Sequence, residues 1–355
     1  MFGGFRLYLA VAVMAFHLMG VPAIGEGAVA SFFVLSGFLM TMIMTETYGY
    51  TAKGMGAFAM NRWLRLYPAY WVAIALSVGV ILITGEQFSA AFNEVLILPH
   101  NPGAWLGNAT MIFPDIIPFR VSPRLSPAAW ALTVELFYYV LIGLGATRTL
   151  FRSSLLLMAG IAYHAWQFAV GAPYEYHYFA IPAGAVPFAM GGLAYHLRAT
   201  LYARSALSAI QWIAIHVAVM LIAMLVQHSW KSTQTCVLSL AAIILVSVPA
   251  VIRLQRDNLP LLSPGIDTLL GKFSYPFYLV HWQMGLLTAC FILGRPDHRA
   301  NTATIAVFPV TLLLTILASF VIIKLIDPGV DRLRRRIKLG VAQDLWAPTP
   351  NAASA

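Results

Sequence analysis

The residues best placed by type and spacing to do chemistry stand in the first predicted helix, between Arg6 and His17. One cation opens this stretch, and one imidazole follows after ten uncharged residues. Ionisable groups inside a membrane-spanning segment are costly and usually functional. At a helical rise of about 1.5 Å per residue, His17 would stand roughly 16 Å from Arg6 along the axis. Arg6 would then lie at one face of a bilayer and His17 near its middle. The alternative for His17 is a histidine packed against a neighbouring helix without chemistry.

The arginine pair Arg62 and Arg65 is the second group that could do chemistry. Positions i and i+3 share one face of a helix, and two guanidiniums there form a fork suited to phosphate. The alternative is an ordinary pair of cations flanking a membrane span. Because Arg6 is expected at the same depth, we favour a site for an anion.

Glu135 and Ser36 add an acid and a hydroxyl within predicted apolar spans. A buried carboxylate without a partner would protonate, so Glu135 needs a cation, hydroxyls or water. It could orient the imidazole of a general base or make a structural hydrogen bond between helices. Ser36 precedes Gly37 and is either a small residue that lets helices approach closely or a nucleophile that would need a neighbouring base.

The stretch 271–282 carries Tyr275, Tyr278 and His281. Its helical rise would place His281 some 13 Å into the membrane. A second imidazole at that depth favours a polar core shared with His17. We expect the two tyrosines and His281, together with Ser36, to line the substrate.

Composition places the chain among helical membrane proteins. Of its 355 residues, 60% are hydrophobic and only 10% are charged, and the mean hydropathy is +0.78. Its apolar runs are near 20 residues, whereas a barrel would show segments of about ten alternating residues. The net charge of +9 is explained by cations in cytoplasmic loops, so no nucleic acid is expected. Cys236 and Cys290 have no metal-ligand spacing, and we expect no metal.

We predict an all-α protein with about ten transmembrane helices and both termini in the cytoplasm. With a cytoplasmic N-terminus, 17 of the 22 Lys and Arg residues fall on the inner side, as the positive-inside rule requires. The first span is not expected to be a cleaved signal peptide, because a removed segment has no use for a buried histidine. The predicted spans are 7–24, 27–45, 66–85, 126–146, 153–171, 179–197, 207–227, 234–252, 273–293 and 302–326.

The predicted organisation is one transmembrane domain over 1–338 and a disordered cytoplasmic tail over 339–355. A basic helix at 331–338 is expected to rest on anionic headgroups. The long outer loop 86–127 is rich in Pro, Asn and aromatic residues and is either a lid or a re-entrant segment.

On these stretches the chain resembles the acyltransferase family 3 integral-membrane O-acyltransferases, from Arg6 to about Asp327. The family usually has Ser where Ala131 stands and often a further Arg where Asn61 stands, which could alter the acceptor site. Five patterns occur in order: Arg6 and His17 with ten residues between, Phe-Phe-Val-Leu-Ser-Gly-Phe at 32–38, Arg62-x-x-Arg65, Trp130-x-Leu132-x-x-Glu135-x-x-Tyr138, and Ser274-Tyr275-x-x-Tyr278-Leu279-x-His281.

The resemblance implies that His17 is the family's essential histidine and Glu135 its acidic residue. Arg6, Arg62 and Arg65 match the family's arginines and would bind the donor phosphates. The implied reaction moves an acyl group, most often acetyl, from cytoplasmic acyl-CoA to a hydroxyl of a cell-surface or exported glycan or glycolipid. His17 would take the proton of the acceptor hydroxyl, with Glu135 or a hydroxyl fixing the imidazole. An acyl-histidine intermediate is the competing mechanism.

These expectations place the protein in a bacterial inner membrane, with acyl-CoA as donor substrate and no permanently bound cofactor. Membrane lipids and the carbohydrate acceptor are expected partners, and a homo-oligomer stays open. The alternative function is a proton-coupled transporter or flippase that uses the same buried His, Glu and Arg groups. Against it stand the lack of an evident internal repeat and the gathering of arginines at one face. A membrane scaffold without activity would need no polar groups at mid-depth.

Overall fold

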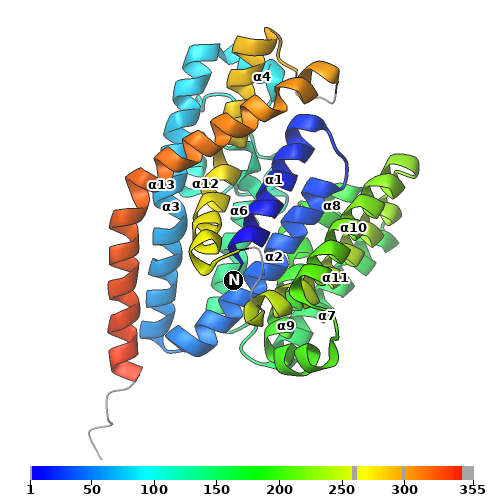
Figure 1. Ribbon diagram of the computed structural model, residues 1–355, viewed down its shortest axis with the longest axis vertical. Coiled ribbons are helices and arrows are strands. Elements are labelled where there is room, and N and C mark those ends of the chain that lie inside the picture. The colour runs from blue at the N-terminus through cyan, green and yellow to red at the C-terminus, as the bar shows by residue number, and fades with distance from the viewer. Residues whose placement is uncertain (1, 258–261, 298–300, 346–355) are drawn as a thin grey trace, which may run out of the picture.

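The computed structural model describes residues 2–257, 262–297 and 301–345, and in this part of the chain it contains helices and no strand (Figure 1). The longer helices are α1 (Gly3–Met19), α2 (Ile24–Ile43), α3 (Ala52–Thr84), α6 (Trp130–Gly143), α7 (Leu150–Ala169), α9 (Ala185–Arg204), α10 (Ala209–Ser229), α11 (Thr233–Arg256), α12 (Pro264–Thr288) and α13 (Thr302–Leu345). The shorter ones are α4 (Glu86–Phe92), α5 (Pro102–Thr110), α8 (Tyr174–Tyr178), the π-helical turns Met44–Tyr48 and Ala289–Leu293, and the 3-10 turns Pro118–Arg120, Pro127–Ala129 and Ile181–Gly184.

Six of the described helices are long and apolar enough to cross a membrane, and α1 and the segment Pro127–Gly143 are shorter apolar helices. The chain is therefore an all-helical, multi-pass membrane protein. Each of the ten predicted spans overlaps a helix, but the count of ten and the cytoplasmic termini stay predictions. The six are Ile24–Tyr48, Ala52–Thr84, Ala209–Ser229, Thr233–Arg256, Pro264–Leu293 and Thr302–Gly340.

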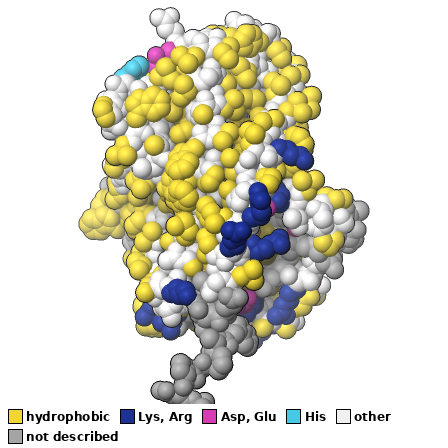
Figure 2. Space-filling view, turned by 90° about the vertical axis from the view of Figure 1, so that its left-hand side faces the viewer, with side chains coloured by type: hydrophobic (Ala, Val, Ile, Leu, Met, Phe, Trp, Pro, Cys, Tyr) yellow, Lys and Arg dark blue, Asp and Glu magenta, His cyan; other side chains and the backbone are white. Residues whose placement is uncertain are grey.

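The face formed by α3 and α13, which run side by side, is largely apolar, and Lys and Arg gather in its lower half (Figures 1 and 2). Leu82 and Ile83 on α3 and Leu313 and Leu317 on α13 are all more than half exposed. Large apolar side chains open to the outside on one continuous face are what a lipid-facing surface requires.

Helix α1 lies in the middle of the molecule, packed between α2 and α12 (Figure 1). Its N-terminus is held by Asp267 of α12, whose carboxylate oxygens accept hydrogen bonds from the amides of Gly3 (3.1 Å) and Gly4 (2.9 Å). A Cβ at Gly3 would lie 1.6 Å from the Asp267 carbonyl oxygen, so this contact requires glycine. Because the start of α1 is anchored to α12, the position of every later residue along the α1 axis is fixed relative to α12.

Two helix boundaries differ from the sequence prediction. Helix α3 begins at Ala52 rather than near 66, because Thr51 caps its N-terminus and accepts a hydrogen bond from the Gly54 amide. Arg62 and Arg65 therefore lie inside a continuous helix and not on its flank. Helix α13 runs unbroken past Pro328 to Leu345, so the start of the predicted disordered tail, 339–345, is helical. The rest of that tail, 346–355, lies outside the described residues.

The loop 86–127, predicted to lie outside the membrane, is a folded cover that includes α4 and α5, and we call it the outer cover. Its buried Arg124 donates hydrogen bonds to the carbonyls of Pro127 (3.2 Å), Phe119 (2.5 Å) and Val121. Burial lowers the pKa of Arg124 to about 10, so the side chain stays charged at neutral pH. These bonds hold the loop together around one cation, and the loop then closes over a cavity described below.

Helices α2 and α9 cross at very short distance. A Cβ at Gly37 would lie 2.2 Å from the Phe188 carbonyl oxygen, and a Cβ at Gly191 would lie 2.2 Å from the Val34 carbonyl oxygen. The stretch around Ser36 therefore does use a small residue for close helix approach, and that residue is Gly37.

The substitution Gly37→Ala should destabilise the protein by about 1–3 kcal/mol, the usual cost of overpacking. Gly79→Ala is the matched control, since a Cβ at Gly79 of α3 meets no atom within 4 Å. The control should be neutral or stabilising by up to about 1 kcal/mol, because alanine favours helix. Unfolding in detergent measures both, and equal losses would contradict the close crossing.

Candidate active site

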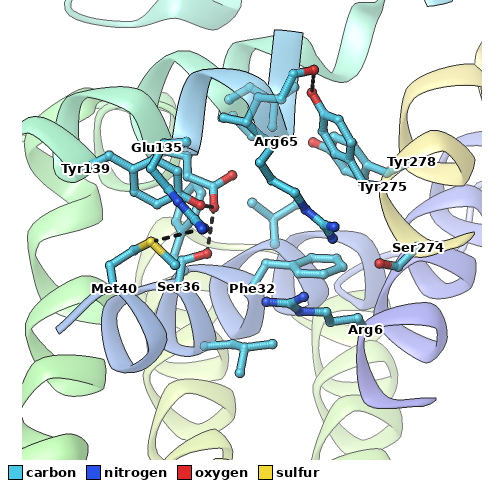
Figure 3. A pocket seen from close by; sticks show the side chains of 17 residues that line it. Arg6, Phe32, Ser36, Met40, Arg65, Glu135, Tyr139, Ser274, Tyr275 and Tyr278 are labelled. Atoms are coloured by element: carbon cyan, nitrogen blue, oxygen red, sulfur yellow. Dashed lines mark hydrogen bonds between the residues drawn. The ribbon is translucent and has the colours of Figure 1, made fainter. Parts of the chain in front are cut away.

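A small pocket of about 100 Å³ with charged and apolar lining lies where α1, α2, α3, α6 and α12 meet (Figure 3). We call it the arginine pocket, because the guanidiniums of Arg6 and Arg65 point into it from different helices and Arg62 also lines it. Its other polar lining residues are Ser36, Glu135, Tyr139, Ser274, Tyr275 and Tyr278.

Glu135 is the carboxylate of the arginine pocket. Its Oε1 accepts a hydrogen bond from Ser36 Oγ at 2.6 Å and another from the Tyr139 hydroxyl. In the described part of the chain, no carboxylate oxygen lies within 4.0 Å of a guanidinium nitrogen of Arg6 or Arg65. The pocket thus holds more positive than negative charge, an arrangement that favours an incoming anion.

A second cavity, the basic mouth, opens next to the arginine pocket and has a volume of about 560 Å³. Arg6 and Arg65 line both spaces. The charged lining of the mouth comprises six cations and two carboxylates: Arg6, Arg65, Lys272, Arg334, Arg335, Lys338, Asp267 and Asp331. The two spaces therefore share a cationic wall.

A third space, the histidine cavity, lies beyond the other end of the arginine pocket and also measures about 560 Å³. His17 lines it, and Tyr278 lines both this cavity and the arginine pocket. The outer cover contributes residues 90–95 and Arg124 to its wall. The remaining lining is aromatic and acidic, with Phe16, Glu26, Phe119, Trp130, Tyr178, Phe179 and Trp282 among its residues.

The ring of His17 is held by aromatic contacts. It stacks on His281 with ring centroids 5.4 Å apart and an angle of 16° between the planes, and it contacts Trp282 at 4.8 Å. His281 is fully buried, and its Nδ1 lies 2.8 Å from the Tyr278 carbonyl oxygen. Since a carbonyl only accepts, Nδ1 carries the proton and Nε2 is the basic nitrogen of His281. Two helices, α1 and α12, thus bring the two predicted imidazoles face to face.

The structure brings most of the predicted site residues to the walls of these neighbouring cavities. His17 lines the histidine cavity with His281 behind its ring. Tyr275 and Tyr278 present their rings to the arginine pocket, while their hydroxyls donate to the carbonyls of Leu66 (3.0 Å) and Ala128 (2.9 Å). The arginine pocket holds Arg6, Arg62, Arg65, Ser36, Glu135, Tyr275 and Tyr278.

Two roles were predicted for Glu135: to orient the imidazole of His17, or to make a structural hydrogen bond between helices. Glu135 lines the arginine pocket, where Ser36 of α2 and Tyr139 donate hydrogen bonds to it, so its contacts match the second role. The physical reason is the direction in which α6 faces: this helix packs on α2 and α3, so its acid points toward the arginines. Ser36 likewise donates to a carboxylate rather than to a histidine base.

Several lining residues escaped the sequence analysis. Tyr139 follows Glu135 by four positions, a spacing that places both on one helical face and could have revealed it. Trp282 is adjacent to His281 in sequence but carried no separate signal. Glu26 and Arg334 reach the cavities only through tertiary packing. Among the described residues there is no group of three or more His, Cys, Asp or Glu that could hold a metal ion.

Fold and site together define a multi-pass membrane protein whose buried cationic pocket adjoins a cavity lined by histidine. The family model described as an acyltransferase domain, Acyl_transf_3, matches residues 2–324. The chain therefore belongs to acyltransferase family 3, which confirms the resemblance, and it is a membrane acyltransferase. No curated protein and no solved structure gave a significant match.

The hydrogen bond from Tyr139 to Glu135 has a matched comparison on the same helix. Tyr139→Phe should destabilise the protein by about 1.5–3 kcal/mol, as for bonds to charged groups. Tyr138→Phe removes a bond to the neutral Ile181 carbonyl (3.0 Å) and should cost only about 0.5–1.5 kcal/mol. Denaturant unfolding in detergent measures both, and the reverse order would show that Glu135 is not held by Tyr139.

Proposed function

We propose that this protein transfers an acyl group, most simply acetyl, from cytoplasmic acyl-CoA to a hydroxyl of a glycan or glycolipid. One observation carries the proposal: the three spaces share lining residues. Arg6 and Arg65 belong to both the basic mouth and the arginine pocket, and Tyr278 belongs to both the arginine pocket and the histidine cavity. A donor with an anionic end and a reactive thioester end fits this order.

The donor would enter with its acyl end first. Its phosphates would bind Arg6, Arg62 and Arg65 through charge-assisted hydrogen bonds, and its thin pantetheine arm would pass through the narrow arginine pocket. The thioester would then stand near Tyr278, at the wall that the pocket shares with the histidine cavity. The acceptor would come from the opposite side, so the two substrates would not compete for one entrance.

In the reaction, His17 acts as the general base. It accepts the proton of the acceptor hydroxyl as that oxygen attacks the thioester carbonyl, and the new C–O bond replaces the C–S bond. The leaving CoA thiolate then takes this proton from the imidazolium and departs as a thiol. The indole ring of Trp282, whose centroid lies 4.8 Å from that of His17, supports the imidazolium while it is charged.

The acceptor side suits a carbohydrate. Trp130, Phe119 and Tyr178 offer flat apolar rings, and Glu26 and Glu94 offer carboxylates that accept hydrogen bonds from hydroxyl groups. An exported glycan or a glycolipid would reach this cavity from outside, and the basic mouth would face the cytoplasm of a bacterial inner membrane. No permanently bound cofactor is needed for this transfer.

Loss of His17 is the first test of the proposal. His17→Ala should lower kcat by about 10²–10⁴, the usual contribution of a general base, with labelled acetyl-CoA and a panel of glycans as substrates. His100→Ala, an exposed histidine of the outer loop, is the control and should leave the rate unchanged. Proton-coupled uptake by the wild type, without release of CoA for any acceptor, would instead establish a transporter.

The arginine pair tests the donor assignment. Arg62→Ala/Arg65→Ala should raise the KM for acetyl-CoA roughly ten- to a hundredfold, since hydrogen bonds to charged groups contribute about 1.5–3 kcal/mol. The control pair Arg148→Ala/Arg152→Ala removes the same charge outside the arginine pocket and the basic mouth. Its donor KM should stay as in the wild type. An unchanged KM in the first double variant would refute phosphate binding by these arginines.

A further inference from the structure

Helix α13 continues well past the part of the chain that the family model covers. The match ends at residue 324, while α13 runs to Leu345. We call residues 325–345 the α13 extension. Asp331, Arg334, Arg335 and Lys338 of this extension line the basic mouth, so a segment outside the matched domain supplies half of the cations there.

Only some of the cations of the α13 extension lie on the helical face that borders the basic mouth. Asp331, Arg334, Arg335 and Lys338 are spaced i, i+3, i+4 and i+7, which is one face of a helix, and this face borders the mouth. Arg332 and Arg336 do not line it. A basic segment that merely lay on headgroups would not need a second charged face directed at a cavity.

Asn61 fixes the α13 extension to the arginine pocket. This buried amide donates through Nδ2 to the Arg334 carbonyl (3.4 Å), and its Oδ1 accepts from Arg334 Nε (3.2 Å) and Arg62 Nη2 (3.0 Å). Arg334 is thereby held with only 18% of its side chain exposed. One amide oxygen thus binds a guanidinium of the arginine pocket and a guanidinium of the mouth.

The carboxylates of the mouth already have partners. Asp331 pairs with Lys272 at 2.8 Å and with Arg334 at 3.5 Å, and Asp267 binds the amides at the start of α1. Arg335 and Lys338 form no salt bridge with another described residue. The positive charge that these two side chains add to the mouth therefore remains available to a ligand.

We propose that the α13 extension forms a phosphate subsite for the nucleotide end of the donor, with Arg334, Arg335 and Lys338 as its ligands. This rests on the proposed function. Volume supports it, because the arginine pocket of about 100 Å³ admits only a thin chain, whereas the mouth of about 560 Å³ has room for a nucleotide. The subsite would make the enzyme select nucleotide-bearing thioesters over those on phosphopantetheine alone.

The same phosphate chemistry could come from an anionic lipid headgroup, and the experiment separates the two sources. Full-length protein in nanodiscs of neutral lipid, with and without anionic lipid, is titrated with CoA and with 4′-phosphopantetheine, which lacks the nucleotide. Arg334→Gln/Lys338→Gln is compared with Arg332→Gln/Arg336→Gln, a pair on the same helix with the same spacing and charge change. Lys338→Gln alone leaves the contacts between Asn61 and Arg334 in place, so it still tests the subsite if the double variant fails to fold.

We expect the first pair to weaken CoA binding roughly tenfold or more in both lipids, and to leave 4′-phosphopantetheine binding unchanged. Lys338→Gln should weaken CoA binding by a smaller factor, and the Arg332 and Arg336 pair should have no effect. Equal losses in both pairs, or a loss confined to anionic nanodiscs, would overturn the subsite in favour of headgroup contact. Wild-type binding of CoA with no loss in any of these variants would refute the subsite alone, whereas no CoA binding by the wild type would also refute the donor assignment.

Discussion

The repulsion among Arg6, Arg62 and Arg65 is the constraint on which the site depends. Three guanidiniums from two helices share one small pocket in the interior of a membrane protein, where charges without compensation are expensive. One carboxylate, Glu135, offsets part of this charge and is itself held by two hydroxyls. The pocket therefore keeps a net positive charge, which a bound anionic ligand would neutralise. The folded protein holds these arginines in place before such a ligand binds.

Helix α1 places one of these arginines, Arg6, and the histidine His17 at different positions along one axis. Its start is fixed by Asp267, so Arg6 stands where the basic mouth and the arginine pocket join, and His17 stands in a separate cavity. Tyr278 stands between these ends, because it lines both the arginine pocket and the histidine cavity. In the proposed reaction, exclusion of water from the small arginine pocket would protect an activated acyl group from hydrolysis.

Two further segments of the chain form walls of the histidine cavity and of the basic mouth. The outer cover, organised around the buried Arg124, walls the histidine cavity. The α13 extension, tied to α3 through Asn61, walls the basic mouth. Each segment is anchored by hydrogen bonds of a buried polar side chain, which are costly to break because the partner would be left unsatisfied. Both walls therefore belong to the folded state.

The amino-acid sequence alone determined the class of fold and the family. Apolar runs define membrane helices, and a helix rises linearly, so the ten residues between Arg6 and His17 predicted their separation. It could not determine rotation about each axis. For that reason the sequence could not decide between the two roles predicted for Glu135, whereas α6 turns this acid toward the arginines. Hydropathy also gives no boundary where a helix leaves the apolar layer, so the early start of α3 and the length of α13 were missed. Only tertiary packing decided which neighbours Asn61, Tyr139 and Arg334 would have. Hydrogen bonds between helices depend on how each helix is rotated about its axis and on which helices lie next to each other. Hydropathy encodes neither.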